Sequence, residues 1–263
     1  MPGNGKKKYS QPLVYIIILN WNGKADTLEC LSSLKKIRYS NYRICLVDNA
    51  STDDSVEAVR SKFPEVGIIE NSENLRFARG NNVGIKFALQ HDAEYVLLLN
   101  NDTKVDSEFL KEMIEVSKSD CMIGMVGPKI YHYDQPDLIW SAGGEISFWK
   151  GKIAHRGLRK RDSEKFDQIV AVDYLTACAL LIRSEVIEKI GLLDPTYFMY
   201  SEDADWCERT RRAGFRLFFA PKAKVWHKIS STSGGGLTPY KALHKVKSSF
   251  LFFKRYARWY HWL

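Results

Sequence analysis

Tyr95-Val96-Leu97-Leu98-Leu99-Asn100-Asn101-Asp102-Thr103 is the stretch of sequence that decides the fold, because it changes from apolar to polar at a single point. The apolar run predicts a buried strand. Ligands of open α/β sheets bind at the carboxyl ends of the strands, so Asp102 is placed to hold a divalent cation or a polar substrate. Asn-Asp-Thr is also ordinary turn chemistry, which is the alternative interpretation. The residues at the ends of the neighbouring strands decide between the two.

The surrounding sequence predicts an α/β fold. Short aliphatic runs alternate with helical patterns in the first half, and connections of that length join parallel strands by right-handed crossovers. The predicted strands are 13–19, 42–47, 66–69 and 95–99, and the predicted helices are 24–34, 53–63 and 81–90. In the second half we expect strands at 125–131, 169–183 and 215–220 and helices at 184–190 and 204–213. The first half is a Rossmann-like nucleotide-binding layer.

Polar residues cluster where the predicted strands end. Asn20 and Asn22 follow the first strand and Asp48 follows the second, so their side chains converge with Asn101 on one edge of the sheet. Asp48 can accept from a base N–H group, and the stretch 74–82 supplies donors near a helix start, where backbone N–H groups favour phosphate. For residues 51–54 we favour a different interpretation, in which they cap the next helix.

A dense acidic cluster, Glu202-Asp203-Ala204-Asp205-Trp206, begins a predicted helix in the second half. Asp203 and Trp206 are three residues apart and would share one face. One interpretation is a general base in a cleft beside an aromatic platform. The other is an acidic first turn that is stabilised by the helix dipole.

Composition limits the class of protein. The chain has 263 residues, 45% of them hydrophobic, and a net charge of +8. The excess charge lies at the two ends, so the body is nearly neutral and nucleic acid is not an expected partner. No apolar stretch approaches the ~18 residues of a membrane span. The polar N-terminus carries no signal-peptide pattern, and we expect a cytoplasmic protein.

The C-terminal stretch 237–263 has six basic residues and no acid. Leu243, Val246, Phe250, Phe253, Ala257 and Tyr260 recur at three- and four-residue spacing, which predicts a basic amphipathic helix. With Phe252, Tyr256, Trp259 and Trp262 added, its aromatic surface suits the interface of an anionic membrane. The alternative is that this helix packs against the body or against a second copy in a homodimer.

The motifs, taken together and in order, resemble those of family-2 glycosyltransferases, most closely the rhamnosyltransferase-like branch. The motifs are 20–23, 47–53, 74–82, 99–102, 202–205 and His227. The resemblance covers about residues 13–230 and implies the GT-A fold, with a mixed central sheet flanked by helices. It also implies inverting transfer of a sugar from a UDP-, dTDP- or GDP-sugar to a glycan or lipid-linked acceptor, with the enzyme peripheral on the cytoplasmic face of a membrane.

The resemblance also implies residue roles. Asp203 would be the general base, with Glu202 beside it, and Asp102 and His227 would hold Mn²⁺ or Mg²⁺. Imidazole favours Mn²⁺. Asp205 and Trp206 would contact the acceptor. The residues expected to bind the nucleotide sugar are Asn20, Asn22, Asp48, Asn74, Arg79, Asn81, Asn101 and Thr176.

Two departures from the family pattern affect these roles. The metal motif is usually Asp-x-Asp, whereas Asn100 stands at its first position, so metal binding would be weaker or would depend more on the donor diphosphate. Arg76 and Arg79 replace two glycines of a loop. Those arginines would either clamp phosphate in bidentate fashion or simply be exposed.

We therefore expect a flexible basic N-terminus (1–12), one GT-A domain (13–236) and a basic amphipathic tail (237–263). Within the domain, 13–105 would bind the nucleotide and 106–236 the acceptor. Two other functions remain open. A sugar-phosphate nucleotidyltransferase usually has a glycine-rich basic loop after the first strand, where this chain has Asn20-Trp21-Asn22-Gly23. A non-catalytic carbohydrate- or membrane-binding module of the same fold is the third candidate.

Overall fold

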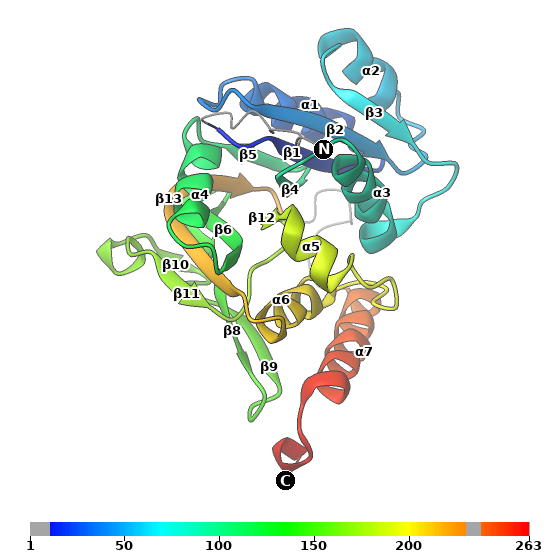
Figure 1. The fold of residues 1–263 in the computed structure, drawn as a ribbon. Helices are drawn as coiled ribbons and strands as arrows, with labels where there is room; N and C mark the ends of the chain where they lie inside the picture. The colour runs from blue at the N-terminus through cyan, green and yellow to red at the C-terminus, as the bar shows by residue number, and fades with distance from the viewer. Residues whose placement is uncertain (1–10, 230–237, 263) are drawn as a thin grey trace, which may run out of the picture.

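The computed structural model describes residues 11–229 and 238–262, built around one mixed sheet (Figure 1). Most of the N-terminal segment 1–12 therefore lies outside the described residues, as do 230–237 and Leu263. The predicted strands of the first half are confirmed as β1 (Val14–Asn20), β2 (Tyr42–Asp48), β3 (Gly67–Glu70) and β4 (Tyr95–Asn100). They are parallel, in the order β4-β1-β2-β3. Their carboxyl ends therefore meet at one edge, with Asn20 directly beside Asp48.

The second half extends the same sheet with antiparallel neighbours. β12 (Ala179–Arg183) pairs with β4 on one side and β6 (Ile123–His132) on the other. β6 also pairs with β7 (Gln135–Ser141) and runs parallel to β13 (Arg216–His227). The remaining strands are β5 (Thr103–Val105), β10 (Lys160–Arg161) and β11 (Val170–Val172), with the separate hairpin β8 (Gly144–Ser147) and β9 (Lys152–His155).

Helices cover both faces of the sheet, and alternating strand residues point to the two layers. Val14, Ile16 and Ile18 pack in the core under α1 (Lys24–Leu34), α2 (Ser55–Lys62) and α4 (Phe109–Lys118). Tyr15 and Ile17 pack on the other side. That second layer holds α3 (Arg76–Gln90), α5 (Ser184–Ile190) and α6 (Glu202–Arg212). The expected GT-A-type mixed sheet with flanking helices is confirmed.

Three predicted boundaries are wrong. The helix expected from residue 81 begins at Arg76, because Gly80 and Gly84 let it lie directly on β1 and β2. The strand expected at 169–183 is interrupted by a turn, which separates β11 from β12. The strand expected at 215–220 continues to His227, since an irregularity after Ala220 restores its pairing with β6.

The C-terminal helix α7 (Pro239–Tyr256) is present, and Figure 1 shows it at the same end of the molecule as the β8–β9 hairpin. Phe252 and Tyr256, expected on a membrane-facing surface, are instead buried against the body. Leu243, Val246 and Phe250 stay more than half exposed. The helix thus packs on the body with one face and presents an apolar stripe on another. Within the described residues, no helix has the length and apolar character needed to cross a membrane.

Candidate active site

A buried polar network joins the carboxyl ends of β1 and β2. Asn20 donates through Nδ2 to Asp48 Oδ1 at 2.8 Å, and Asp48 Oδ2 accepts from the Ser51 N–H group at 2.8 Å. Asn20 Oδ1 accepts from Asn101 Nδ2 at 3.1 Å and from Thr27 Oγ1 at 2.9 Å. Ser51 therefore belongs to this network and does not cap α2, contrary to the expectation. The network fixes Asp48 and Asn101 in place at the sheet edge.

Other residues expected to bind the donor lie around this network. Asn22 Oδ1 accepts from the Thr52 N–H group at 2.7 Å and so holds that loop. Asn74 is exposed and its Oδ1 accepts from the Arg76 N–H group at 2.8 Å. Asn81 is buried and donates within α3 to the Phe77 carbonyl. Arg79 is exposed, with Glu73 at 3.8 Å, so among these residues it is the least constrained.

The two departures from the family pattern have distinct surroundings. The Arg76 guanidinium carbon lies 3.5 Å from the centre of the Phe198 ring, a cation–π contact. This stacking holds Arg76 against the second half of the protein. Asn100 ends β4, and its carbonyl oxygen accepts from Thr103 Oγ1 at 2.7 Å. This bond shapes the turn that presents Asp102.

Asp102 and His227 form a buried pair across β5 and β13. His227 pairs with Thr103 in the ladder, which brings its Nε2 atom to 3.1 Å from Asp102 Oδ1. The two side chains are only 6% and 7% exposed. The contact is not aligned as a hydrogen bond, so Asp102 Oδ1 and both ring nitrogens of His227 lack hydrogen-bond partners. Buried polar atoms without partners are costly, and a bound divalent cation would satisfy the carboxylate and one nitrogen.

Burial and neighbouring groups shift the pKa values of both Asp102 and His227. Burial raises the pKa of Asp102, but His227 outweighs this, and the net direction is downward. Burial lowers the pKa of His227, but the Cys178 thiol and the Asp102 carboxylate together raise it to about 10. The described residues contain no cluster of three or more acidic, histidine or cysteine ligands. A cation held here would therefore need further ligands from a substrate or from water.

Asp203 is the second residue of α6, and its carboxylate accepts several hydrogen bonds. Its Oδ2 atom accepts from the Tyr174 hydroxyl at 2.7 Å and from the Ala177 N–H group at 3.3 Å. Its Oδ1 atom accepts from the Ala204 N–H group at 2.8 Å. Burial raises the pKa of Asp203 in spite of these bonds. A carboxylate of fixed orientation and raised pKa is suited to take a proton from a hydroxyl group.

Glu202 lies beside Asp203 and is buried, and its Oε2 atom has no hydrogen-bond partner. Burial, reinforced by the charge of Asp203, raises the pKa of Glu202 to about 8. At neutral pH Glu202 therefore carries a proton, and it adds no second negative charge beside Asp203.

An arc of rings connects the Asp102–His227 pair to Asp203. The Trp140 ring centre lies 4.8 Å from that of His227 and 4.7 Å from that of His155, and His155 lies 5.4 Å from Tyr174. The Tyr174 hydroxyl in turn donates a hydrogen bond to Asp203. Cys178 lies among the same groups: it follows Ala177, which bonds Asp203, and its carbonyl oxygen accepts from the Asn100 N–H group at 2.8 Å, two residues before Asp102. Thr176 Oγ1 accepts from the Cys178 N–H group at 3.3 Å. These contacts bring the predicted metal ligands and the predicted base into one site.

The expected acceptor roles of Asp205 and Trp206 do not fit the structure. Both are fully buried. Trp206 donates to the Gly191 carbonyl and packs in the core, so it cannot form an exposed platform. Asp205 accepts hydrogen bonds from Arg209 of its own helix and from Arg255 and Tyr256 of α7, and the last two bonds dock α7 on α6. A helix turns by about 100° per residue, so Asp205, two residues after Asp203, lies on the opposite face, whereas Trp206 shares a face with Asp203 but is covered by the core.

Sequence reasoning missed several residues of the site. Tyr174, His155 and Trp140 lie on separate segments, and their convergence depends on how β7, β9 and the turn before β12 are placed. Of the residues expected to bind the donor, only Thr176 pointed to that turn. Asn49 was also missed, although its amide bonds Asn71 and Asn74 at 2.9 and 3.2 Å.

Two solved structures share this fold. The mannosyltransferase PcManGT from Pyrobaculum calidifontis, in complex with GDP-Man and Mn²⁺, matches with a TM-score of 0.69 and 16% identity, over 95% of this chain and 66% of that chain. GalNAc-T7 with UDP, GalNAc and Mn²⁺ matches with a TM-score of 0.67 and 16% identity, over 83% of this chain and 44% of that chain. The fold is thus that of the GT-A glycosyltransferases.

The chain belongs to glycosyl transferase family 2, whose model matches residues 15–191. An N-acetylglucosaminyl-diphospho-decaprenol L-rhamnosyltransferase of Mycobacterium tuberculosis is 26% identical, over 88% of this chain and 80% of the relative. The dTDP-rhamnosyl transferase RfbF of Shigella flexneri is 22% identical, over 92% of this chain and 80% of the relative. The resemblance found in the motifs is therefore confirmed.

Proposed function

We propose that this protein is an inverting, metal-dependent glycosyltransferase that moves a hexosyl or deoxyhexosyl group from a nucleotide sugar to a hydroxyl group of a glycan or lipid-linked acceptor. The observation that carries the proposal is the convergence of Asp203 and the Asp102–His227 pair, whose facing atoms have no hydrogen-bond partner, on the segment Ala177-Cys178. Two relatives are named as rhamnosyltransferases, which makes dTDP-rhamnose the first donor to test.

Each residue has one task in this proposal. Tyr174 orients Asp203, which takes the proton of the acceptor hydroxyl as that oxygen attacks the sugar carbon. Asp102 and His227 would hold Mn²⁺ or Mg²⁺, and the bound cation would neutralise the charge of the departing nucleotide. The network of Asn20, Asp48 and Asn101 shapes the edge on which the nucleotide would lie.

The two halves of the domain would divide this work. Residues 13–105 would bind the nucleotide sugar and residues 106–236 the acceptor. The exposed stripe of Leu243, Val246 and Phe250, together with the basic side chains of α7, would hold the enzyme against an anionic membrane surface on the cytoplasmic side.

The proposal is tested by binding of UDP-, GDP- and dTDP-sugars, each with Mn²⁺ and with EDTA, measured by calorimetry. We expect one nucleotide sugar to bind selectively and only with the metal, and the D102A variant to lose this dependence. A protein that binds none of them, or binds one equally well in EDTA, contradicts the proposal and favours a non-catalytic module.

A further inference from the structure

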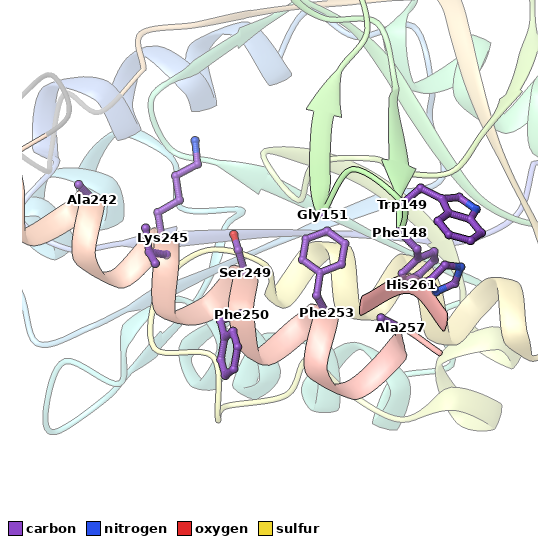
Figure 2. Close-up of a pocket in the computed structure, with 11 residues that line it drawn as sticks. Phe148, Trp149, Gly151, Ala242, Lys245, Ser249, Phe250, Phe253, Ala257 and His261 are labelled. Atoms are coloured by element: carbon purple, nitrogen blue, oxygen red, sulfur yellow. The ribbon is translucent and has the colours of Figure 1, made fainter. Parts of the chain in front are cut away.

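An apolar groove lies where the turn of the β8–β9 hairpin meets α7. Its volume is about 540 Å³, within the range typical of small-molecule sites. Its walls are mainly apolar, with Phe148 and Trp149 from the hairpin and Val246, Phe250 and Phe253 from the helix. Figure 2 shows this arrangement. The groove contains none of the residues assigned above to the donor or to the metal.

One end of the groove is cationic. Figure 2 shows Lys245 at the opposite end of the row of lining residues from Trp149 and His261. Lys245 has no ion-pair partner within the part of the chain that the structure describes, since none of the ion pairs there includes it. The groove therefore combines one free positive charge at one end with apolar walls along its length. This combination is complementary to an amphiphile with an anionic head group.

One wall of the groove leads toward the candidate active site. His155 ends β9, the strand that follows the groove residue Gly151. The charge of Lys245 adds to the effect of burial in lowering the pKa of the His155 ring to about 4. His155 contacts Tyr174, and Tyr174 bonds Asp203. A ligand whose anionic head lies at Lys245 would thus present the group attached to that head to the candidate base.

The other end leads to the most exposed apolar side chains of this region. Trp149 is 71% exposed and Trp259 76% exposed. Such aromatic side chains are typical of membrane interfaces. A hydrocarbon chain could therefore leave the groove directly into a bilayer on which α7 lies.

We propose that this groove holds the hydrocarbon chain of a lipid diphosphate acceptor, with the diphosphate at Lys245 and the acceptor sugar toward Asp203. This inference rests on the proposed function and specifies its acceptor. The occupant is a single isoprenoid-like chain, because the groove has mainly apolar walls and a positive charge at one end. A bulk phospholipid is the competing source of the same chemistry, and the experiment distinguishes the two.

The test is binding of farnesyl diphosphate to the full chain in EDTA, with inorganic diphosphate and farnesol as comparison ligands. We expect farnesyl diphosphate to bind at least about tenfold more tightly than diphosphate, because only the former buries apolar surface. K245M should weaken binding of farnesyl diphosphate about tenfold and leave farnesol unchanged, because it removes a charge-assisted contact. S249W, which fills the groove, should weaken both.

Matched controls are K152M and S163W, which change exposed residues outside the groove and should bind like the unaltered protein. Equal affinities for farnesyl diphosphate and diphosphate, or equal effects of K245M and K152M, would overturn the inference. Displacement of farnesyl diphosphate by isoprenoid-free anionic vesicles would also overturn it, by assigning the groove to bulk lipid. Metal-dependent binding of nucleotide sugars, measured on the same preparations, shows separately whether the proposed function fails.

Discussion

Asp203 is the residue on which the proposed chemistry depends most directly. Asp203→Asn preserves shape but removes the proton acceptor, so we expect transfer to fall by at least about 100-fold while binding of the nucleotide sugar is retained. Single-turnover transfer assays and calorimetry measure the two effects.

The matched control for that variant is Asp173→Asn, which alters a half-exposed carboxylate paired with Arg211. It should transfer sugar normally. Retained activity in Asp203→Asn would show that another group takes the proton.

Because Glu202 is buried, we expect the stability of the folded protein to depend on pH. Its pKa rises from an ordinary value of about 4.5 to about 8, so the folded state keeps a proton that the unfolded state has released. Stability is therefore lost as the pH rises through this window. The Glu202→Gln variant does not undergo this loss. The free energy of unfolding of the variant minus that of the unaltered protein should therefore increase by at least about 1 kcal/mol between pH 5 and pH 9.

Urea denaturation across this pH range measures the difference. Glu115→Gln, on the exposed surface of α4, should leave the pH dependence unchanged. Parallel curves for Glu202→Gln and the unaltered protein would mean that Glu202 is ionised in the folded state.

At the scale of elements, the close approach of α3 to the sheet governs the donor edge. A Cβ atom at Gly84 would lie 2.4 Å from Ile17 Cγ2 and 3.0 Å from Val47 Cγ2. We expect Gly84→Ala to lower the free energy of unfolding by about 1–3 kcal/mol, because crowding exceeds the gain in helix propensity. Urea denaturation checks this value.

Gly67→Ala is the control, since its added Cβ would meet only Ile44 O at 3.5 Å. That variant should differ little in stability. An equal or smaller effect of Gly84→Ala would mean that α3 can shift away from β1.

The elements also show what the sequence could and could not predict. β1 and β4 were predictable because each is a continuous aliphatic run that is buried on both faces, and β2 because its second half, Ile44-Cys45-Leu46-Val47, is apolar and largely buried. The start of α3 was not, since Gly80, Asn81 and Asn82 favour a loop locally and only packing against the sheet stabilises the helix there. Asp102 and Asp203 were recognisable from motifs, whereas Tyr174 and His155 join them only through tertiary contacts.

At the scale of the whole molecule, charge concentrates on the end that carries α7. Lys247 and Lys254 are exposed there, and we expect the double variant Lys247→Ala/Lys254→Ala to bind anionic vesicles roughly tenfold or more weakly, at about 1 kcal/mol per lysine. Vesicle sedimentation at low and high salt measures it.

Lys111→Ala/Lys118→Ala removes the same charge from α4, which Figure 1 shows far from α7, and should bind vesicles normally. Equal losses in both double variants would indicate that net charge, and not the α7 surface, determines vesicle binding.

The first turn of α6 has two attachments that together have a mechanical consequence. Asp203 faces the site, while Asp205, two residues later, is bonded to Arg255 and Tyr256 of α7. A displacement of α7 would therefore pull on the backbone that carries the candidate base. Binding of α7 to a lipid surface would thus be coupled, through Asp205, to the alignment of the proton acceptor Asp203. The arrangement of the candidate active site would then depend on whether the enzyme is bound to its membrane.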